Sequence, residues 1–328
     1  MSVLIRTLRV EEFDDFMRYV ERAFGLSKGF FQRQYPHMYQ PTEEACSWGY
    51  VVEENGKIVS HVGLYPIEVV TAGVHLRVGG IGAVSTAHDA RGKGHMTALL
   101  RHVVEEMRRL DYPISWLGGD RQRYSTFGWE LAGLMYKLTF SRRSMGRYSV
   151  EPTPIEEMLP SEIVETVQRF ESHPACHPIR PHLAQQLQKV DLRLWAAADG
   201  YAIAVGQAFH HARVVELVSA SGNELGLLQA VLNRCTVDRV TWDLSAWDEA
   251  RLGRVMPATS RWELGNNEMY RINDLAALLT AARPTLEPRA AALRNFAVAV
   301  ALQEHDRLSV TTIAVEDGEV VIRPGRHA

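Results

Sequence analysis

The sequence predicts an α/β (α+β) protein divided into three consecutive domains, at residues 1–145, 146–274 and 275–328. Short apolar segments with strand patterning alternate with amphipathic helical patterns along the first domain, which is typical of a sheet covered by helices. A stretch rich in proline and arginine at residues 141–160 then interrupts the pattern and indicates a boundary. A chain of 328 residues is long enough for two or three domains with cores of their own.

The elements of the first domain follow from hydrophobic periodicity and turn residues. The pair Asn55-Gly56 favours a tight hairpin turn between two strands. In chain order, we expect a strand at 3–8, a helix over 10–24, strands at 47–52, 57–65, 69–78 and 79–86, a helix over 95–111, and strands at 114–119 and 131–140.

A short glycine-containing loop joins the strand ending at residue 86 to the helix that begins near residue 95. Gly92 and Gly94 have no side chains, so backbone N–H groups here can approach a ligand closely. The helix dipole places partial positive charge at the same point, and Arg91 and Lys93 add full charges. The loop therefore predicts a site for a phosphate or pyrophosphate group.

The loop matches neither the GxxxxGK[ST] pattern of P-loop proteins nor the GxGxxG pattern of dinucleotide-binding folds. Residues 91–96, RGKGHM, resemble instead the [Q/R]-x-x-G-x-[G/A] signature of the GCN5-related N-acetyltransferases (GNAT). Met96 departs from the small residue usual at the sixth place, and a bulkier residue there is common in the Eis-type (enhanced intracellular survival) branch. An ordinary strand-to-helix turn is the alternative, which the amphipathic helix after the loop makes the weaker interpretation.

The resemblance implies a site for acetyl-CoA as acyl donor. In the family the loop cradles the pyrophosphate, and the preceding strand hydrogen-bonds the pantetheine arm through its backbone. The residues that correspond in this sequence are Val84, Ser85 and Thr86 on the strand, and Arg91, Gly92, Lys93, Gly94, His95, Met96 and Thr97 in the loop and at the start of the helix.

A second segment further along the chain supports the same resemblance. Residues 124–129, YSTFGW, are similar to the Y-x-x-F-G-[YFW] segment of the family, which implies that Tyr124 protonates the departing CoA thiolate. A phenol with a pKa of about 10 is protonated at neutral pH, and a thiolate whose thiol has a pKa of about 8.5 is a nearly matched acceptor. Taken alone, Tyr124 fits better as a half-buried aromatic residue that packs under the loop; beside the loop at residues 91–96, the role of acid is favoured.

The group that takes the proton from the attacking amine is left open by the sequence. The strand leading into the loop, residues 78–84, has no carboxylate. Candidates elsewhere are His61, Glu68, Asp120 and, by resemblance to the Eis-type family, the terminal carboxylate of Ala328. Deprotonation through water, or binding of an amine that is already neutral, is an equal alternative.

Two side-chain clusters have no diagnostic motif. The aromatic residues Phe30, Phe31 and Tyr35 resemble a region that lines the acceptor pocket in relatives, with plain core packing as the alternative. A second cluster contains His173, Cys176, His177 and His182. Because prolines interrupt it and no second ligand pair follows at zinc-finger spacing, we predict a proline-rich loop and no metal site.

The remaining two domains resemble later parts of the Eis-type family. Strands at 202–205 and 213–218 and a helix over 223–235 repeat the strand–loop–helix order. The loop at 219–226 has no Arg or Lys, and Glu224 would repel a pyrophosphate. We therefore expect a degenerate GNAT-like domain and one acetyl-CoA site per chain. The last domain, with helices at 275–282 and 289–296 and strands at 297–302, 309–315 and 319–323, resembles a shortened SCP2-like tail, for which lipid carriage is a further hypothesis.

The composition of the chain bears on its expected partners and cellular compartment. A net charge of −3 gives no indication of a nucleic-acid or anionic-membrane partner. We expect neither a signal peptide, because charge interrupts the first apolar residues, nor a membrane span, because no apolar run is long enough. Three widely spaced cysteines, Cys46, Cys176 and Cys235, favour a reduced cytoplasmic compartment.

The sequence therefore predicts an acetyl-CoA-dependent N-acetyltransferase. The acceptor would be a primary amine of a small molecule or of a lysine side chain, which attacks the thioester directly. The alternative is a non-catalytic acyl-CoA sensor or assembly module that keeps the loop but transfers nothing. Self-association into a homo-oligomer is left open.

Overall fold

The structure is a computed structural model that describes residues 3–174, 176–207, 211–266, 268–293, 296–304 and 307–325. The chain groups into two compact units, each assembled from separate segments. Met1–Lys28, Gln40–Leu131 and Glu268–Ala328 form the first unit, and Gly29–Tyr39 and Ala132–Asn267 form the second. In this grouping the end of the chain belongs to the same unit as its beginning, and the three predicted domains stay a prediction.

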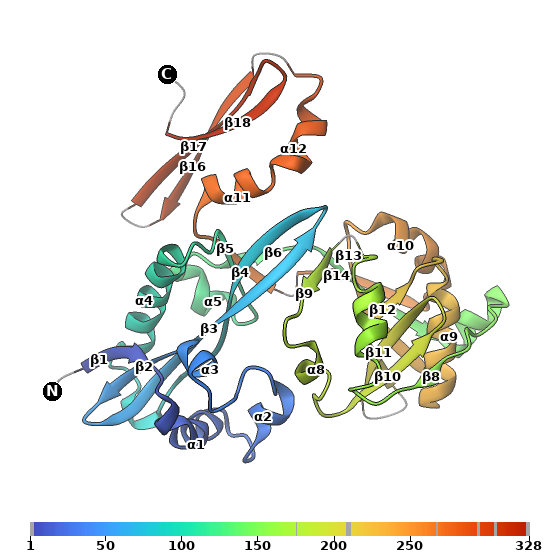
Figure 1. Cartoon of the computed structure of the whole chain (residues 1–328), viewed down its shortest axis with the longest axis horizontal. Helices are drawn as coiled ribbons and strands as arrows, with labels where there is room; N and C mark the ends of the chain where they lie inside the picture. Colours follow the sequence, from blue (N-terminus) through green and yellow to red (C-terminus); the bar gives the residue numbers. More distant parts are fainter. Residues whose placement is uncertain are drawn as a thin grey trace. The chain divides into compact units, whose positions relative to one another are not determined.

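The first unit is built on a mixed sheet in which the strands follow the order β1-β2-β3-β4-β5-β15-β6 (Figure 1). All described neighbours from β1 to β15 are antiparallel except β4 and β5, which are parallel. The strands are β1 (Val3–Thr7), β2 (Gly49–Glu54), β3 (Lys57–Thr71), β4 (Val74–Thr86), β5 (Ile114–Leu117), β15 (Glu268–Ile272) and β6 (Glu130–Ala132), and the helices are α1 (Phe13–Phe24), α3 (Glu43–Ser47), α4 (His95–Arg109) and α5 (Arg121–Tyr124).

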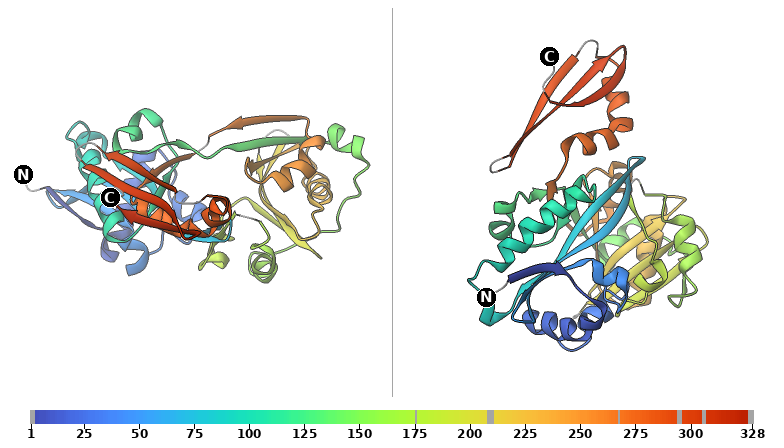
Figure 2. Two further views of the ribbon diagram at one scale, coloured as in Figure 1. Left: turned by 90° about the horizontal axis from the view of Figure 1, so that it is seen from above. Right: turned by 60° about the vertical axis from the view of Figure 1, so that its left-hand side comes forward.

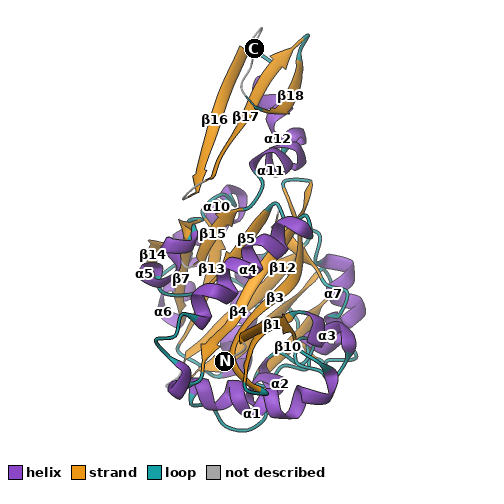
Figure 3. Cartoon of the chain, turned by 90° about the vertical axis from the view of Figure 1, so that its left-hand side faces the viewer, coloured by secondary structure: helices purple, strands orange, loops and turns teal. Residues whose placement is uncertain are grey.

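Helices α1 and α4 cover opposite faces of this sheet (Figure 3). Successive residues of a strand point to opposite faces. Val62 on β3 belongs to the buried cluster formed with the apolar face of α4, whereas the preceding His61 packs against Phe16 of α1. The apolar face predicted for this helix is confirmed: Leu99, Leu100, Val103, Val104 and Met107 are buried, and Leu110, directly after α4, is partly buried against the same cluster. The helix ends at Arg109, slightly before the predicted end.

Three turns decide where the strands of the first 141 residues begin and end. The predicted hairpin turn at Asn55-Gly56 is confirmed, with φ of 53° and 74°. The prediction of one strand over 69–78 is wrong, because the chain reverses at Ala72 and Gly73, also with positive φ. The prediction of one strand over 131–140 is wrong as well, because Gly133 (φ 74°) separates β6 from β7 and the two belong to different sheets.

The second unit contains a sheet with the strand order β14-β7-β13-β12-β11-β10-β8. Helix α9 contributes a nearly continuous buried surface to its core. The strands of this sheet are β14 (Arg261–Gly265), β7 (Met135–Ser141), β13 (Arg239–Ser245), β12 (His211–Ser219), β11 (Gly200–Gln207), β10 (Leu192–Ala197) and β8 (Glu156–Glu157). The strand β9 (Cys176–Ile179) is not part of this sheet. The helices are α2 (Phe30–Gln34), α6 (Arg142–Met145), α7 (Val164–Phe170), α8 (Leu183–Gln186), α9 (Glu224–Cys235) and α10 (Glu249–Val255). The predicted strand–loop–helix order around residues 213–235 is confirmed.

The last segment of the chain forms a three-stranded antiparallel sheet with two helices (Figure 2). It consists of α11 (Leu275–Ala281), α12 (Arg283–Ala290), β16 (Phe296–Glu304), β17 (Arg307–Glu316) and β18 (Glu319–Pro324). Helix α12 begins at Arg283, earlier than the predicted residue 289, because the chain turns at Ala282 directly into a helix with proline in its first turn. The helices in the described part of the chain are all too short or too polar to span a lipid bilayer.

Candidate active site

The first distinctive feature of the site is a β-bulge near the end of β4. The register pairs His61 with Ser85 but Gly63 with Gly82, so β4 contains one residue more than β3 across this step. Ala83 has a φ of 48°, a left-handed conformation that is strained for a residue with a side chain. The extra residue redirects the last part of β4.

The second feature is the place where β4 and β5 separate. Their described pairs run from Val78–Ile114 to Ile81–Leu117 and end there. Residues 82–86 of β4 therefore have no described pairing with β5 on that side. Backbone groups released in this way can pair with an extended ligand as a neighbouring strand would.

A cavity of about 560 Å³ lies at this end of β4 and at the start of α4. Every predicted acetyl-CoA residue except Lys93 lines it, together with four residues that the sequence did not predict: Ala23, Phe24, Ala90 and Arg123. Phe24 is the last residue of α1, and Arg123 lies on α5. The only signal for Arg123 was its position next to Tyr124 in the second motif.

The loop before α4 presents backbone to this cavity. Gly92 and Gly94 have φ of 78° and 80°, and Gly94 is the N-cap residue of α4. A Cβ built on either glycine would meet no protein atom within 4 Å. The space beside the first N–H groups of α4 is thus open, which is the arrangement that binds phosphate groups at a helix N-terminus.

The two cations of the loop have different surroundings. Nζ of Lys93 donates to the carboxylate of Glu54 at 2.8 Å and 3.0 Å, and this hydrogen bonding lowers the pKa of Glu54. His95 is buried, with Nε2 3.9 Å from the same carboxylate. Arg91 lines the cavity, and its Nε lies 3.5 Å from the carbonyl oxygen of Thr86. Arg91 is therefore the loop cation that lines the cavity, while the charge of Lys93 is compensated by Glu54.

Tyr124 ends the short helix α5. Asp120 caps this helix by accepting a hydrogen bond from the backbone of Gln122 at 3.0 Å. The ring of Tyr124 is buried in the cluster beneath α4, and burial raises the pKa of its hydroxyl. Gly119 makes room for the ring, since a Cβ there would lie 2.5 Å from Cε2 of Tyr124. The neighbouring Arg123 lines the cavity and Tyr124 itself does not, so its role as an acid stays a prediction.

Of the candidate bases, His61, Glu68 and Asp120 do not line the cavity either. His61 is buried, and burial lowers its pKa to about 4, which makes it a weak base. Glu68 is half-buried, and its carboxylate lies 3.0 Å from Nε2 of His75. Asp120 is occupied as a helix cap. Ala328 lies outside the described residues.

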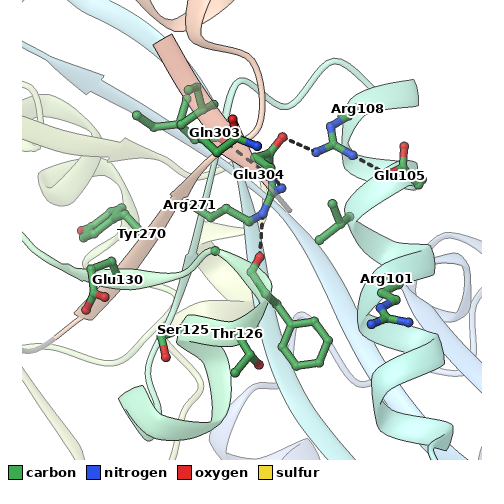
Figure 4. Close-up of a pocket in the computed structure, with 15 residues that line it drawn as sticks. Arg101, Glu105, Arg108, Ser125, Thr126, Glu130, Tyr270, Arg271, Gln303 and Glu304 are labelled. Carbon is green, nitrogen blue, oxygen red and sulfur yellow. Dashed lines mark hydrogen bonds and ion pairs between the residues drawn. The ribbon is translucent and has the colours of Figure 1, made fainter. Parts of the chain in front are cut away.

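A second cavity of about 600 Å³ lies between α4, the segment after α5, β15 and the end of β16 (Figure 4). No motif in the sequence indicates this cavity. Its centre holds an ion-pair chain in which Glu304 accepts from Arg271 and, at 2.7 Å, from Arg108. Arg271 also donates to the carbonyl oxygen of Phe127 at 2.9 Å. These pairs attach β16 to α4 and β15, and they compensate the charges at the centre of the cavity.

The other residues that the sequence singled out, in the aromatic cluster, the loop before α9 and the histidine-rich segment, make contacts with neighbouring residues. Phe31 lies against Tyr39, with ring centroids 4.9 Å apart, so part of the aromatic cluster is core of the second unit. Glu224 is buried and paired with Arg254 at 2.6 Å. Nδ1 of His177 lies 3.0 Å from the carbonyl oxygen of Pro174. Among the described residues, no group of three or more His, Cys, Asp or Glu is placed to hold a metal ion.

Comparison with known proteins supports this picture. Residues 4–132 match the family described as acetyltransferase (GNAT) domain. A probable N-acyltransferase of unknown function from Enterococcus faecalis V583 has a similar structure, with a TM-score of 0.74 and 17% identity over 99% of this chain and 86% of that chain. A GCN5-related N-acetyltransferase from Kribbella flavida has a TM-score of 0.71 and 18% identity over 100% and 86%.

Eis1 from Mycobacterium abscessus is similar as well, with a TM-score of 0.71 and 16% identity over 100% of this chain and 86% of that chain. No curated protein matches the sequence. At these identities the structures indicate a common fold. The chain therefore shares the mixed α/β fold of GNAT acetyltransferases over its length, and its residues 4–132 match their acetyltransferase domain.

Proposed function

We propose that the protein is an N-acetyltransferase that uses acetyl-CoA as acyl donor and a primary amine as acceptor. The observation that carries this proposal is the cavity where β4 leaves β5, because the open strand backbone and the glycine loop meet there. Residues 84–86 would pair with the pantetheine arm. Arg91 and the first N–H groups of α4 would bind the pyrophosphate.

The proposed chemistry is direct transfer. The neutral amine attacks the thioester carbonyl, the new C–N bond forms and the C–S bond breaks. The thiolate leaves with a proton from Tyr124, and the amine loses its own proton to water or to a base that stays unassigned. Burial raises the pKa of the phenol, so the hydroxyl is protonated at neutral pH but is a weaker proton donor than an exposed tyrosine.

A non-catalytic acyl-CoA sensor is the second candidate, because Tyr124 is buried and does not line the cavity. Purified protein with acetyl-CoA and a panel of polyamines, aminoglycosides and lysine peptides separates the two. We expect amine-dependent release of free thiol and an acceptor that gains one acetyl group by mass spectrometry. Tight binding of acetyl-CoA without thiol release for any amine would favour the sensor, and absence of binding would reject both.

The two loop cations allow a specific binding prediction. Arg91→Ala should weaken acetyl-CoA binding about tenfold, the effect of one charge-assisted hydrogen bond to phosphate. Lys93→Ala should weaken it less than about threefold, because Glu54 already compensates the charge of Lys93. Calorimetric titration at two salt concentrations measures both values. Equal losses in the two variants would contradict the assignment of Arg91 as the cation that faces the ligand.

A further inference from the structure

The carbonyl oxygen of Ala83, at the bulge, has a side chain as hydrogen-bond partner. Nδ1 of His61 lies 2.9 Å from this oxygen. A carbonyl oxygen can only accept, so Nδ1 carries the hydrogen and donates it. The site therefore fixes the tautomer of His61.

The ring of His61 is enclosed from several sides. Its side chain is 1% exposed. The ring of Phe16 on α1 lies 4.7 Å away between centroids. On β2, a Cβ built on Gly49 would lie 3.2 Å from Nε2 of His61, so only glycine leaves full room for the ring there. The imidazole is thus held between α1, β2 and the bulge.

The residues that follow the bulge are held by a second set of hydrogen bonds. Oγ of Ser60 donates to the carbonyl oxygen of Ser85 at 2.9 Å and lies 2.9 Å from Oγ1 of Thr86. The hydroxyl of Tyr19 lies 3.2 Å from Oγ of Ser85. Ser85 and Thr86 both line the cavity. Side chains of β3 and α1 therefore fix this part of β4 from one side, while its other side faces the cavity.

We propose that His61 is a positioning residue of the acyl-CoA site: its Nδ1–H holds the carbonyl of Ala83, maintains the bulge and so sets the path of residues 84–86. The inference rests on the function proposed above. His61 does not line the cavity and acts only through Ala83. The Nδ1 hydrogen serves as the donor in this role, and because His61 is not in the cavity lining we assign it positioning and no proton transfer.

Two matched substitutions test the proposal. The amide nitrogen of asparagine reaches about the place of Nδ1 of histidine, and that of glutamine about the place of Nε2. His61→Asn should therefore keep the bond to Ala83 and bind acetyl-CoA within about threefold of the natural protein. His61→Gln should lose the bond and weaken binding about tenfold, with the loss in KM for acetyl-CoA rather than in kcat.

The melting temperature shows whether each variant is folded under the conditions of the binding measurement. Both variants lose the ring contact with Phe16 and should melt lower, and His61→Gln should melt lowest because it also leaves the carbonyl of Ala83 without its partner. A difference in affinity at a temperature at which both variants are folded supports the proposal. Equal affinity in the two variants, whether reduced or unchanged, would overturn it.

Nitrogen NMR of the His61 imidazole tests the hydrogen bond to Ala83 without relying on the proposed function. Failure of the natural protein to bind acetyl-CoA would reject the proposed function. The spectrum then decides whether His61 holds the bulge, with its signals assigned by their absence in His61→Asn. A neutral ring with the hydrogen on Nδ1 at pH 7 supports the hydrogen bond to Ala83, and hydrogen on Nε2 overturns it.

Discussion

Tyr124→Phe should lower turnover by about 10²–10⁴-fold and leave the affinity for acetyl-CoA nearly unchanged. The substitution removes only the hydroxyl and keeps the ring that packs in the cluster beneath α4. The departing thiolate would then have to leave without a positioned proton donor, which raises the barrier in the transition state but not in the bound ground state. Steady-state kinetics with calorimetric binding measures the two effects separately.

Tyr112→Phe is the matched control. Tyr112 belongs to the same buried cluster, and burial likewise raises its pKa, but it does not line the acyl-CoA cavity. We expect the turnover of this variant to remain within about twofold of that of the natural protein, because the substitution lies away from the cavity and keeps the core packed. If Tyr124→Phe turned over as fast as Tyr112→Phe, Tyr124 would have no part in the reaction.

Gly94→Val should abolish acetyl-CoA binding at concentrations that saturate the natural protein. A side chain at this position would project beside the first turn of α4, where no protein atom lies within 4 Å and where the pyrophosphate is proposed to bind. It would both fill that space and strain a backbone with φ of 80°. Binding is measured by calorimetry, and folding by the melting temperature.

Gly56→Val separates the strain from the blocked site. Gly56 has a φ of 74° in the β2–β3 turn, a Cβ there would also meet no protein atom within 4 Å, and it does not line the cavity. Both variants carry a similar backbone strain, of about 1–3 kcal/mol. We expect Gly56→Val to keep binding while it melts lower. Tight binding of acetyl-CoA by Gly94→Val would remove the loop from the site.

Local patterns were sufficient for the elements of the site. The apolar face of α4 repeats at helical spacing and is buried as predicted, because a helix can bury such a face in only one way. Asn55-Gly56 forms the predicted turn, because both residues tolerate a positive φ. The turn at Ala72-Gly73 was missed because alanine, unlike asparagine, gives no signal of the left-handed conformation that it adopts here.

Features that depend on distant partners were not predictable. The bulge at Ala83 is a property of the register between two strands, and no residue type marks it. The compensation of Lys93 needs Glu54 on another strand, and Arg123 joins the cavity only because α5 follows the strand that separates from β4. Likewise β15, far along the chain, pairs with β5 and extends the first sheet.

The sequence by itself therefore determined the α/β class, the strand–glycine loop–helix unit and the residues of the proposed phosphate site, because these depend on periodicity and backbone freedom over short distances. The tertiary structure decided which loop cation lines the cavity and where β4 separates from β5. It also decided that His61 donates to the carbonyl oxygen of Ala83, the residue with positive φ in the bulge. Those properties arise from hydrogen bonds and charges between segments that only the folded chain brings together.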